Sequence, residues 1–354
     1  MKKGLRFLIA GLIVLLALFI WDSPIQENEP LLAPETIDPL PANESADVSL
    51  GAARPDAGVS MFIGKSVEEW LAQFGEPARI EPSAFEYEWW VYPEPLAEYK
   101  MAGVRDGKVV QVYAAGAETN IEPFTIGQTL EELYRFTIVQ SEVSVEFDSN
   151  VYTFHLATDD LNKRLLVKFN GVYAQLYLDQ EDGRLEAARF IDAQTLISHR
   201  PYDMIYMGEL LPREKPSSRD QQAVDAANTR QLVEIANVYR NHHGQPLLPV
   251  LPELHEVAKA HSADMAQNTL GDADSEPMSL AERLEAADIA YDEAAANTAV
   301  EYYDAAEAVH GWLNSDKHRS ILLAEEFTHT GAGVFNQFYT QEFLRRDAAS
   351  VLSD

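Results

Sequence analysis

The sequence predicts an α+β protein with more than one domain. Three observations support this fold class: a helix followed by strand-like segments occurs twice in the middle of the chain, helical spacing begins near residue 221, and two strand patterns close the C-terminal third. A chain of 354 residues exceeds the usual size of one hydrophobic core. Its hydrophobic fraction of 46% supplies enough apolar surface for two.

The N-terminus combines a basic flank with an apolar run. Lys2, Lys3 and Arg6 precede apolar residues from Phe7 to Trp21. The run is short for a spanning helix, which favours a cleaved signal peptide. However, no small-residue cleavage site follows it, and Trp21 suits a membrane interface. We predict a signal anchor at 1–21, with a single-pass topology that leaves the bulk of the chain extracellular at the cell membrane; cleavage, and hence secretion, is the alternative.

The segment after this run is rich in proline and acidic residues and poor in aromatic residues. Such a composition buries too little apolar area to offset conformational entropy. Residues 22–60 are therefore predicted to form a disordered tether.

Charge and cysteine content exclude several classes of function. The formal net charge is −30, and the chain without residues 1–21 has 24 basic and 57 acidic residues, or −33. Such a surface repels polyanions, so no nucleic-acid partner is expected. The absence of cysteine excludes disulfides, thiolate zinc sites and cysteine nucleophiles.

An internal duplication organises residues 61–200, with repeats at about 62–120 and 125–195. Residues 63–71 recur as 126–134. Each copy has a hydroxyl residue three positions before a glutamate, Ser66 with Glu69 and Thr129 with Glu132, a spacing typical of a helix capping box. We therefore predict a helix at the start of each repeat.

Strand patterns follow each of these predicted helices. They lie at 85–92 and 109–113 in the first copy and at 151–156, 165–169 and 172–177 in the second. Asn170-Gly171 predicts a tight hairpin turn. Each repeat is thus interpreted as one helix packed on a small antiparallel sheet. The pattern resembles the CAP-associated N-terminal domain of Bacillus-type membrane proteins. Prolines and serines at 201–220 indicate a linker.

Helical periodicity returns at about residue 221. Apolar residues mark one helical face up to Arg240, a second stripe over 251–265 and a third helical stretch between 305 and 323. Segments 327–334 and 338–343 are predicted to be antiparallel strands. This domain is assigned to 221–345, followed by a tail at 346–354.

Three motifs give this region a resemblance. They are Asn237-x-x-Arg240, the segment from Trp312 to Arg319, and Tyr339-Thr340-Gln341-x-Phe343. Together they resemble the bacterial branch of the CAP superfamily (cysteine-rich secretory, antigen 5 and pathogenesis-related proteins). The resemblance implies an α-β-α sandwich and, for many members, a metal-binding cleft lined by two histidines and two acidic residues.

The cleft residues depart from that family pattern. Asp272 stands at the position of the usual first histidine, and Ala296 replaces the glutamate of Gly-Glu-Asn, whereas His318 is retained. A metal bound by one histidine and one aspartate would lack several ligands. We therefore expect no metal, no cofactor and no catalytic residue. The candidate cleft residues are His318, Arg319, Asp272, Asn297, Gln341 and Glu293, the last as a substitute acid.

These observations favour a non-catalytic, membrane-tethered extracytoplasmic protein. CAP domains as a family bind lipids and proteins, so the expected partner is an unidentified envelope protein or lipid. Two alternatives remain open. One is a CAP-type hydrolase or protease, metal-dependent or metal-independent, and the other is an envelope or sporulation accessory protein.

Overall fold

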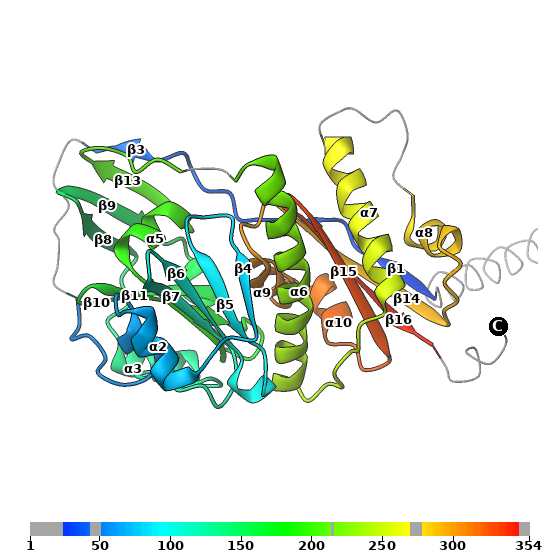
Figure 1. Cartoon of the computed structure of the whole chain (residues 1–354), viewed down its shortest axis with the longest axis horizontal. Helices are drawn as coiled ribbons and strands as arrows, with labels where there is room; N and C mark the ends of the chain where they lie inside the picture. Colours follow the sequence, from blue (N-terminus) through cyan, green and yellow to red (C-terminus); the bar gives the residue numbers. More distant parts are fainter. Residues whose placement is uncertain (1–23, 43–50, 214–215, 270–277, 347–354) are drawn as a thin grey trace, which may run out of the picture.

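The computed structural model describes residues 24–42, 51–213, 216–269 and 278–346. The predicted anchor at 1–21 and the candidate residue Asp272 lie outside these ranges, as do residues 347–354 of the predicted tail. None of the described helices is both long enough and apolar enough to cross a bilayer. The architecture is α+β and layered, with helices and sheets alternating along the long axis of the molecule (Figure 1).

The first repeat forms a helix and four strands, with two short 3-10 helices at Val59–Phe62 and Leu96–Glu98. These elements are α2 (Val67–Phe74), β4 (Arg79–Pro82), β5 (Glu88–Tyr92), β6 (Lys100–Arg105) and β7 (Lys108–Ala114). The second repeat and the segment after it form α3 (Leu130–Phe136), β8 (Glu142–Phe147), β9 (Asn150–His155), α4 (Asp160–Lys163), β10 (Arg164–Phe169), β11 (Val172–Leu178), β12 (Leu185–Ile191), α5 (Ala193–His199) and β13 (Asp203–Met207).

The duplication is visible in equivalent backbone hydrogen bonds. Gly64 N–H donates to Val109 O at 2.7 Å, and its counterpart Gly127 N–H donates to Leu185 O at 2.7 Å. Both predicted capping boxes are formed, at Ser66 and at Thr129. Because these caps satisfy free N–H groups of the first turn, each repeat begins its helix at the predicted position.

The antiparallel strands expected in each repeat are present, and the structure joins the two groups. Strands of both repeats form one seven-stranded sheet in the order β10-β11-β12-β7-β6-β5-β4. β8 and β9 instead form a second sheet with β13 and β3 (Leu40–Pro41). The sheets merge because β12 and β7, which come from different repeats, pair antiparallel and leave neither edge free.

The C-terminal region is an α-β-α sandwich. Its elements are α6 (Ser218–His242), α7 (Pro252–Thr269), α8 (Leu280–Ala286), β14 (Glu293–Val300), α9 (Ala305–Leu313), α10 (Asp316–Leu322), β15 (His329–Phe335) and β16 (Phe338–Arg345). α6, α9 and α10 cover one face of this sheet, and α7 and α8 cover the other (Figure 1).

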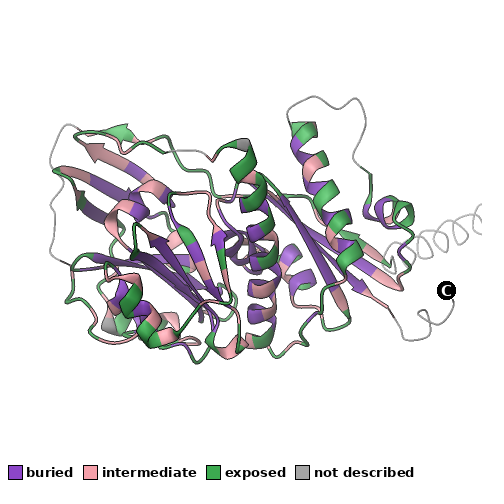
Figure 2. Ribbon diagram, viewed as in Figure 1, coloured by how far each residue is buried: buried purple, intermediate pink, exposed green. Residues whose placement is uncertain are grey.

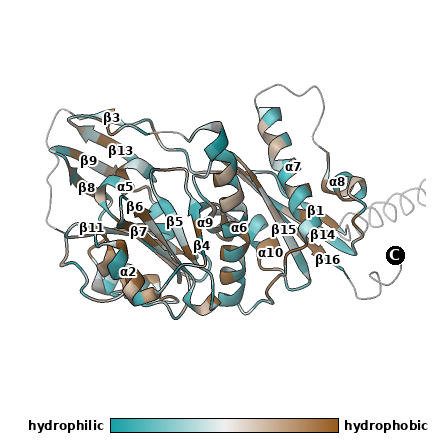
Figure 3. Ribbon diagram, in the orientation of Figure 1, coloured by the Kyte–Doolittle hydropathy of each residue, from teal (hydrophilic) through white to brown (hydrophobic). Residues whose placement is uncertain are grey.

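The two halves share one hydrophobic core. A cluster of buried side chains joins one face of the seven-stranded sheet to α6, α9 and the C-terminal sheet. The other face of the seven-stranded sheet packs against α2 and α3. Buried segments lie in the strands between these layers (Figure 2), and the same strands contain much of the hydrophobic sequence (Figure 3). α6 therefore lies between two sheets, in the middle of the molecule.

Parts of the predicted tether and linker are ordered strands. β1 (Ile25–Glu27) and β2 (Leu31–Leu32) pair in parallel with β14, and β3 pairs in parallel with β13. β13 itself lies in the predicted linker. Composition failed to reveal these strands because each is too short to show periodicity and gains its hydrogen bonds from the edge of an existing sheet. We call residues 24–33, which run along β14, the strap.

Candidate functional site

The structure brings three of the candidate residues together. His318 lies on α10, Asn297 on β14 and Gln341 on β16, and all three are buried. Asn297 Nδ2–H donates to the main-chain oxygen of His318 at 2.8 Å. Gln341 is the cross-strand partner of Asn297, so both amides belong to the same face of the sheet. These contacts position α10 on the sheet.

Both ring nitrogens of His318 have partners. Nε2 lies 3.1 Å from Glu29 O of the strap, and Nδ1 lies 2.8 Å from Ser315 Oγ. A carbonyl oxygen only accepts, so Nε2 carries the proton and Nδ1 accepts from the serine hydroxyl. Burial lowers the pKa of His318, which favours this neutral form. In this arrangement the ring has no free lone pair for a metal.

The structure separates Arg319 and Glu293 from His318. Arg319 follows His318 on α10 but points to the N-terminal half, where its NH1 lies 2.8 Å from Asp179 Oδ2. Glu293 begins β14 and pairs with Arg345 at 2.6 Å. It is four residues before Asn297, roughly 13 Å along a strand. Ala296 packs in an apolar cluster with α7 and α8.

Sequence reasoning missed a carboxylate supplied by the strap. Glu27 is the cross-strand partner of Ala296, so its side chain lies on the same face as that methyl group. Glu27 Oε1 lies 2.9 Å from Arg283 NH1 and 3.7 Å from His261 Nε2, and Oε2 accepts from Leu280 N–H at 2.9 Å. No local pattern could have identified Glu27, since its partners lie more than 230 residues away in the sequence.

Arg283 joins this carboxylate to a second one. Its NH2 lies 3.2 Å from Glu342 Oε1 on β16, and both side chains are buried. Burial raises the pKa of Glu342 to about 7, and the nearby Glu27 adds to this rise while Arg283 opposes it. Burial and the Arg283 cation lower the pKa of His261 to about 4. His261 is therefore a neutral, buried residue on α7.

The described cleft does not fit the metal that the family pattern implies. His318 has both nitrogens engaged, Ala296 offers a methyl group, and Glu27 lies on the opposite face of the sheet from His318. Across the described ranges, the acidic and histidine side chains close enough to share an ion are Asp179, Glu186 and His243. That cluster lies at the junction of the two halves.

Basic side chains already occupy this junction cluster. Arg319 pairs with Asp179, and His242 Nδ1 and His243 Nε2 lie 2.6 and 3.4 Å from Glu186. Burial opposes ionisation of Glu186, but these histidines lower its pKa to about 2. The hydrogen bond to Glu186 in turn raises the pKa of His243. An open hollow of about 680 Å³ adjoins the cluster, lined by Glu181, Asn314 and Arg319 among others.

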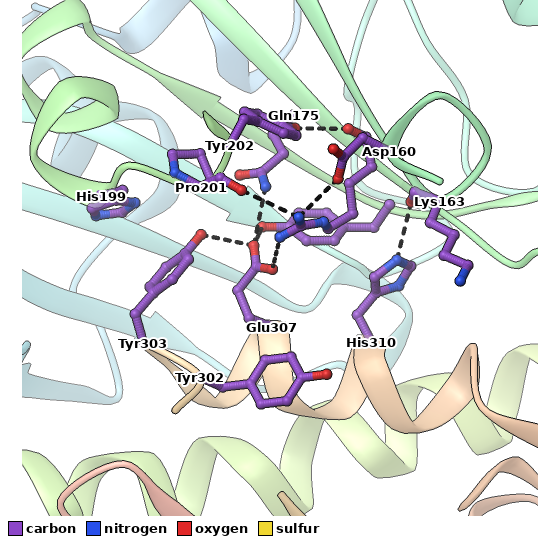
Figure 4. Close-up of polar contacts among 12 residues, drawn as sticks. Asp160, Lys163, Gln175, His199, Pro201, Tyr202, Tyr302, Tyr303, Glu307 and His310 are labelled. Carbon is purple, nitrogen blue, oxygen red and sulfur yellow. Dashed lines mark hydrogen bonds and ion pairs between the residues drawn. The ribbon is translucent and has the colours of Figure 1, made fainter. Parts of the chain in front are cut away.

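A second buried network joins the halves around Glu307 of α9 (Figure 4). Its carboxylate accepts from Arg164 at 3.0 Å, Tyr177 at 2.6 Å, Tyr303 at 2.7 Å and Gln175 at 3.1 Å. Burial favours the neutral acid, yet Arg164 and Arg189 lower the pKa of Glu307 to about 2. Glu307 is thus an ionised and fully paired buried carboxylate.

Arg189 forms the adjacent part of this junction. It is completely buried on β12, and its NH2 donates to Asp304 Oδ2 at 2.7 Å. Its guanidinium carbon lies within 6.0 Å of four aromatic ring centres, those of Trp89, Tyr113, Tyr177 and Tyr303. Such cation–π contacts are favourable when the cation is removed from water. These ionic contacts fix the N-terminal half against α9.

Two families match consecutive parts of the chain. Residues 63–202 match the CAP-associated N-terminal family, and residues 233–344 match the cysteine-rich secretory protein family. The chain is 36% identical to the Bacillus subtilis (strain 168) membrane protein YlbC, over 98% of this chain and all of that protein. It is 22% identical to YkwD of the same organism, over 65% of this chain and 90% of that one.

Solved structures show the same two-part fold. An extracellular protein containing an SCP domain from Bacillus anthracis (strain Ames) is 34% identical, with a TM-score of 0.75 over 88% of this chain and 100% of that one. A cysteine-rich secretory protein from Staphylococcus aureus (Mu50) has the same TM-score at 24% identity, over 90% and 100% of the two chains. The chain belongs to the CAP, or cysteine-rich secretory protein, family, in the group that carries a CAP-associated N-terminal domain.

Proposed function

We propose that this chain is a membrane-tethered extracytoplasmic CAP protein that acts by binding a partner at the cell envelope rather than by turnover. The observation that carries the proposal is the state of the cleft. His318 has both ring nitrogens engaged, and the residue at the usual acid position is the buried methyl group of Ala296. A general base or metal site cannot be built from that methyl group.

The proposed location, outside the cytoplasm and tethered to the membrane, is supported by the N-terminal sequence and by the descriptions of two relatives. Lys2, Lys3 and Arg6 before the apolar run are typical of a segment whose N-terminus stays in the cytoplasm. YlbC is described as a membrane protein, and the Bacillus anthracis relative as an extracellular one. We extend both descriptions to this chain as a single anchor with an external body.

The test is cross-linking and capture from cell envelopes with the full chain, beside a protease and esterase screen. The proposal expects a specific envelope partner and no activity above that of a His318→Ala variant. Ser320→Ala is the matched control, because it changes an exposed residue of the same helix without touching the cleft or the junction. Robust activity that disappears in His318→Ala but persists in Ser320→Ala would favour the hydrolase instead.

Calorimetric titration with zinc gives an independent test of the cleft. We expect no one-to-one site of sub-micromolar affinity, because His318 has no free lone pair and Ala296 offers no ligand. A tight site that is lost in His318→Ala would contradict the proposal.

A further inference from the structure

The strap pairs with the C-terminal sheet in a different direction from the other strands of that sheet. β14, β16 and β15 are antiparallel neighbours, whereas β1 and β2 run parallel to β14 at its outer edge. Two main-chain bonds frame the strap: Ala294 N–H donates to Pro24 O at 2.8 Å, and Ala33 N–H donates to Val300 O at 2.9 Å. Strand addition of this kind is also how sheet edges recognise extended peptides, with main-chain bonds giving affinity and side-chain pockets giving specificity.

The strap engages both faces of the sheet through specific contacts. On the α8 face, Ile25 packs against the apolar cluster and Glu27 pairs with Arg283. On the α10 face, Leu31 packs against the central core, and Glu29 presents its main-chain oxygen to His318. The edge therefore recognises a carboxylate, a carbonyl and two apolar side chains at defined positions along one extended segment.

Several features make the strap replaceable. Its two strands contain three and two residues, and Pro30 between them has no N–H to donate. Leu32 is 64% exposed. Among the described residues, three buried polar atoms next to the strap's contacts have no protein partner: His261 Nδ1 and Glu342 Oε2 around Glu27 and Arg283, and Asn297 Oδ1 beside His318. The strap thus satisfies the polar groups of this site incompletely, whereas buried polar groups are generally paired.

We propose that the outer edge of β14, with Arg283 on one face and His318 on the other, docks an extended acidic segment of a partner protein, and that the strap occupies this site in cis until the partner displaces it. This inference rests on the proposed binding function and specifies its ligand class. Recognition is through main-chain pairing with β14 and a carboxylate on Arg283.

The cis arrangement sets how strongly a partner must bind. A segment joined to its site by a short linker has an effective concentration in the millimolar range. A partner must therefore form more contacts than the strap does, and pairing with the three buried polar atoms is one way to do so. The net charge of −33 outside the first 21 residues opposes an acidic ligand. At physiological ionic strength, salt screens this repulsion between charges more than about 8 Å apart, whereas the direct contact with Arg283 is screened much less.

The test measures binding of a fluorescein-labelled peptide with the sequence of residues 24–33 to the full chain in detergent, by fluorescence anisotropy. In the wild type the strap competes, so binding should be weak. Ile25→Asp combined with Leu31→Asp removes both apolar contacts of the strap, and the peptide should then bind at least tenfold more tightly. A peptide carrying glutamine in place of Glu27 should lose about tenfold in affinity for this variant.

Two comparisons keep the test decisive. Gln26→Ala alters an exposed strap residue and should bind the peptide as weakly as the wild type. Glu27→Gln in the full chain weakens the strap but keeps its apolar contacts. It should also bind the unmodified peptide more tightly than the wild type does, and it replaces the double variant if that variant folds poorly. The proposal would be overturned if the peptide bound equally to all folded variants, or if a scrambled peptide bound as well as the strap peptide. Binding of lipid vesicles instead of the peptide would also overturn it. Those results would leave the envelope-capture test of the proposed function intact.

Discussion

The Glu307 network and the strap both join distant parts of the chain through buried charges, but they satisfy those charges to different degrees. Glu307 is fully buried and accepts from four side chains. Glu27 is partly exposed and shares Arg283 with Glu342, and one oxygen of Glu342 has no partner in the described part of the chain. A fully paired carboxylate such as Glu307 favours one arrangement, whereas a partly paired contact is open to exchange. The junction is therefore the fixed part of the molecule, and the strap its exchangeable part.

The largest expected effect is at the junction. Glu307→Ala leaves the buried Arg164 with Asp160 as its remaining carboxylate and removes the acceptor shared by Tyr177, Tyr303 and Gln175. Breaking a buried ion pair costs up to about 5 kcal/mol. Chemical denaturation should show this loss in the free energy of unfolding. Glu131→Ala removes an exposed i,i+4 pair with Arg135 and serves as the control, with a loss below about 0.5 kcal/mol. Equal losses in the two variants would refute the contrast.

A similar but purely packing effect is expected at Trp312. This side chain is completely buried on α9, and its Nε1–H donates to Thr298 O at 3.0 Å. Trp312→Ala should cost about 4 kcal/mol, within the range for large-to-small changes in a core. Loss of less than about 1 kcal/mol in the same denaturation experiment would mean that α9 is not anchored to the sheet in this way.

A smaller effect concerns pH. The pKa of His243 is raised in the folded state, so the stability it contributes is complete below its ordinary value and is lost as pH rises through the folded value. Unfolding between pH 6 and pH 9 should show a fall on the order of 1 kcal/mol, as for a hydrogen bond to a charged partner. Glu342, whose pKa is raised to about 7, acts in the same direction.

Variants can separate these two groups. His243→Gln should remove the part of the pH dependence that arises at the junction, and Glu342→Gln the part beside the strap. A double variant with the full wild-type pH dependence would contradict both assignments.

Much of the fold could be predicted from local patterns. The capping boxes at Ser66 and Thr129, the Asn170-Gly171 turn and the C-terminal helices all depend on neighbours within a few residues, and the structure contains each of them. β12 was missed because all seven of its residues are buried, Arg189 among them, so it shows no alternation. The seven-stranded sheet depends on pairing between repeats, which no local pattern encodes.

The candidate site could be predicted in part for the same reason. His318, Asn297 and Gln341 were found because they belong to motifs. Arg319 was placed beside His318 in sequence, yet adjacent residues on a helix point about 100° apart, and Arg319 instead faces Asp179. Glu27 was missed because its role depends on a parallel pairing with β14 across most of the chain.

Hydrogen exchange with mass spectrometry on the full chain tests the contrast between the strap and the junction most directly. The amide of Ala33, bonded to Val300 O, reports on the strap, and that of Ala308, bonded to Asp304 O in α9, reports on the junction. We predict that the amide of Ala33 exchanges through local opening, at a rate that low denaturant does not change, and that this rate is higher in Glu27→Gln than in the wild type. The amide of Ala308 should exchange only with global unfolding. Exchange of both amides at the same rate, with the same denaturant dependence, would contradict an exchangeable strap on a fixed junction.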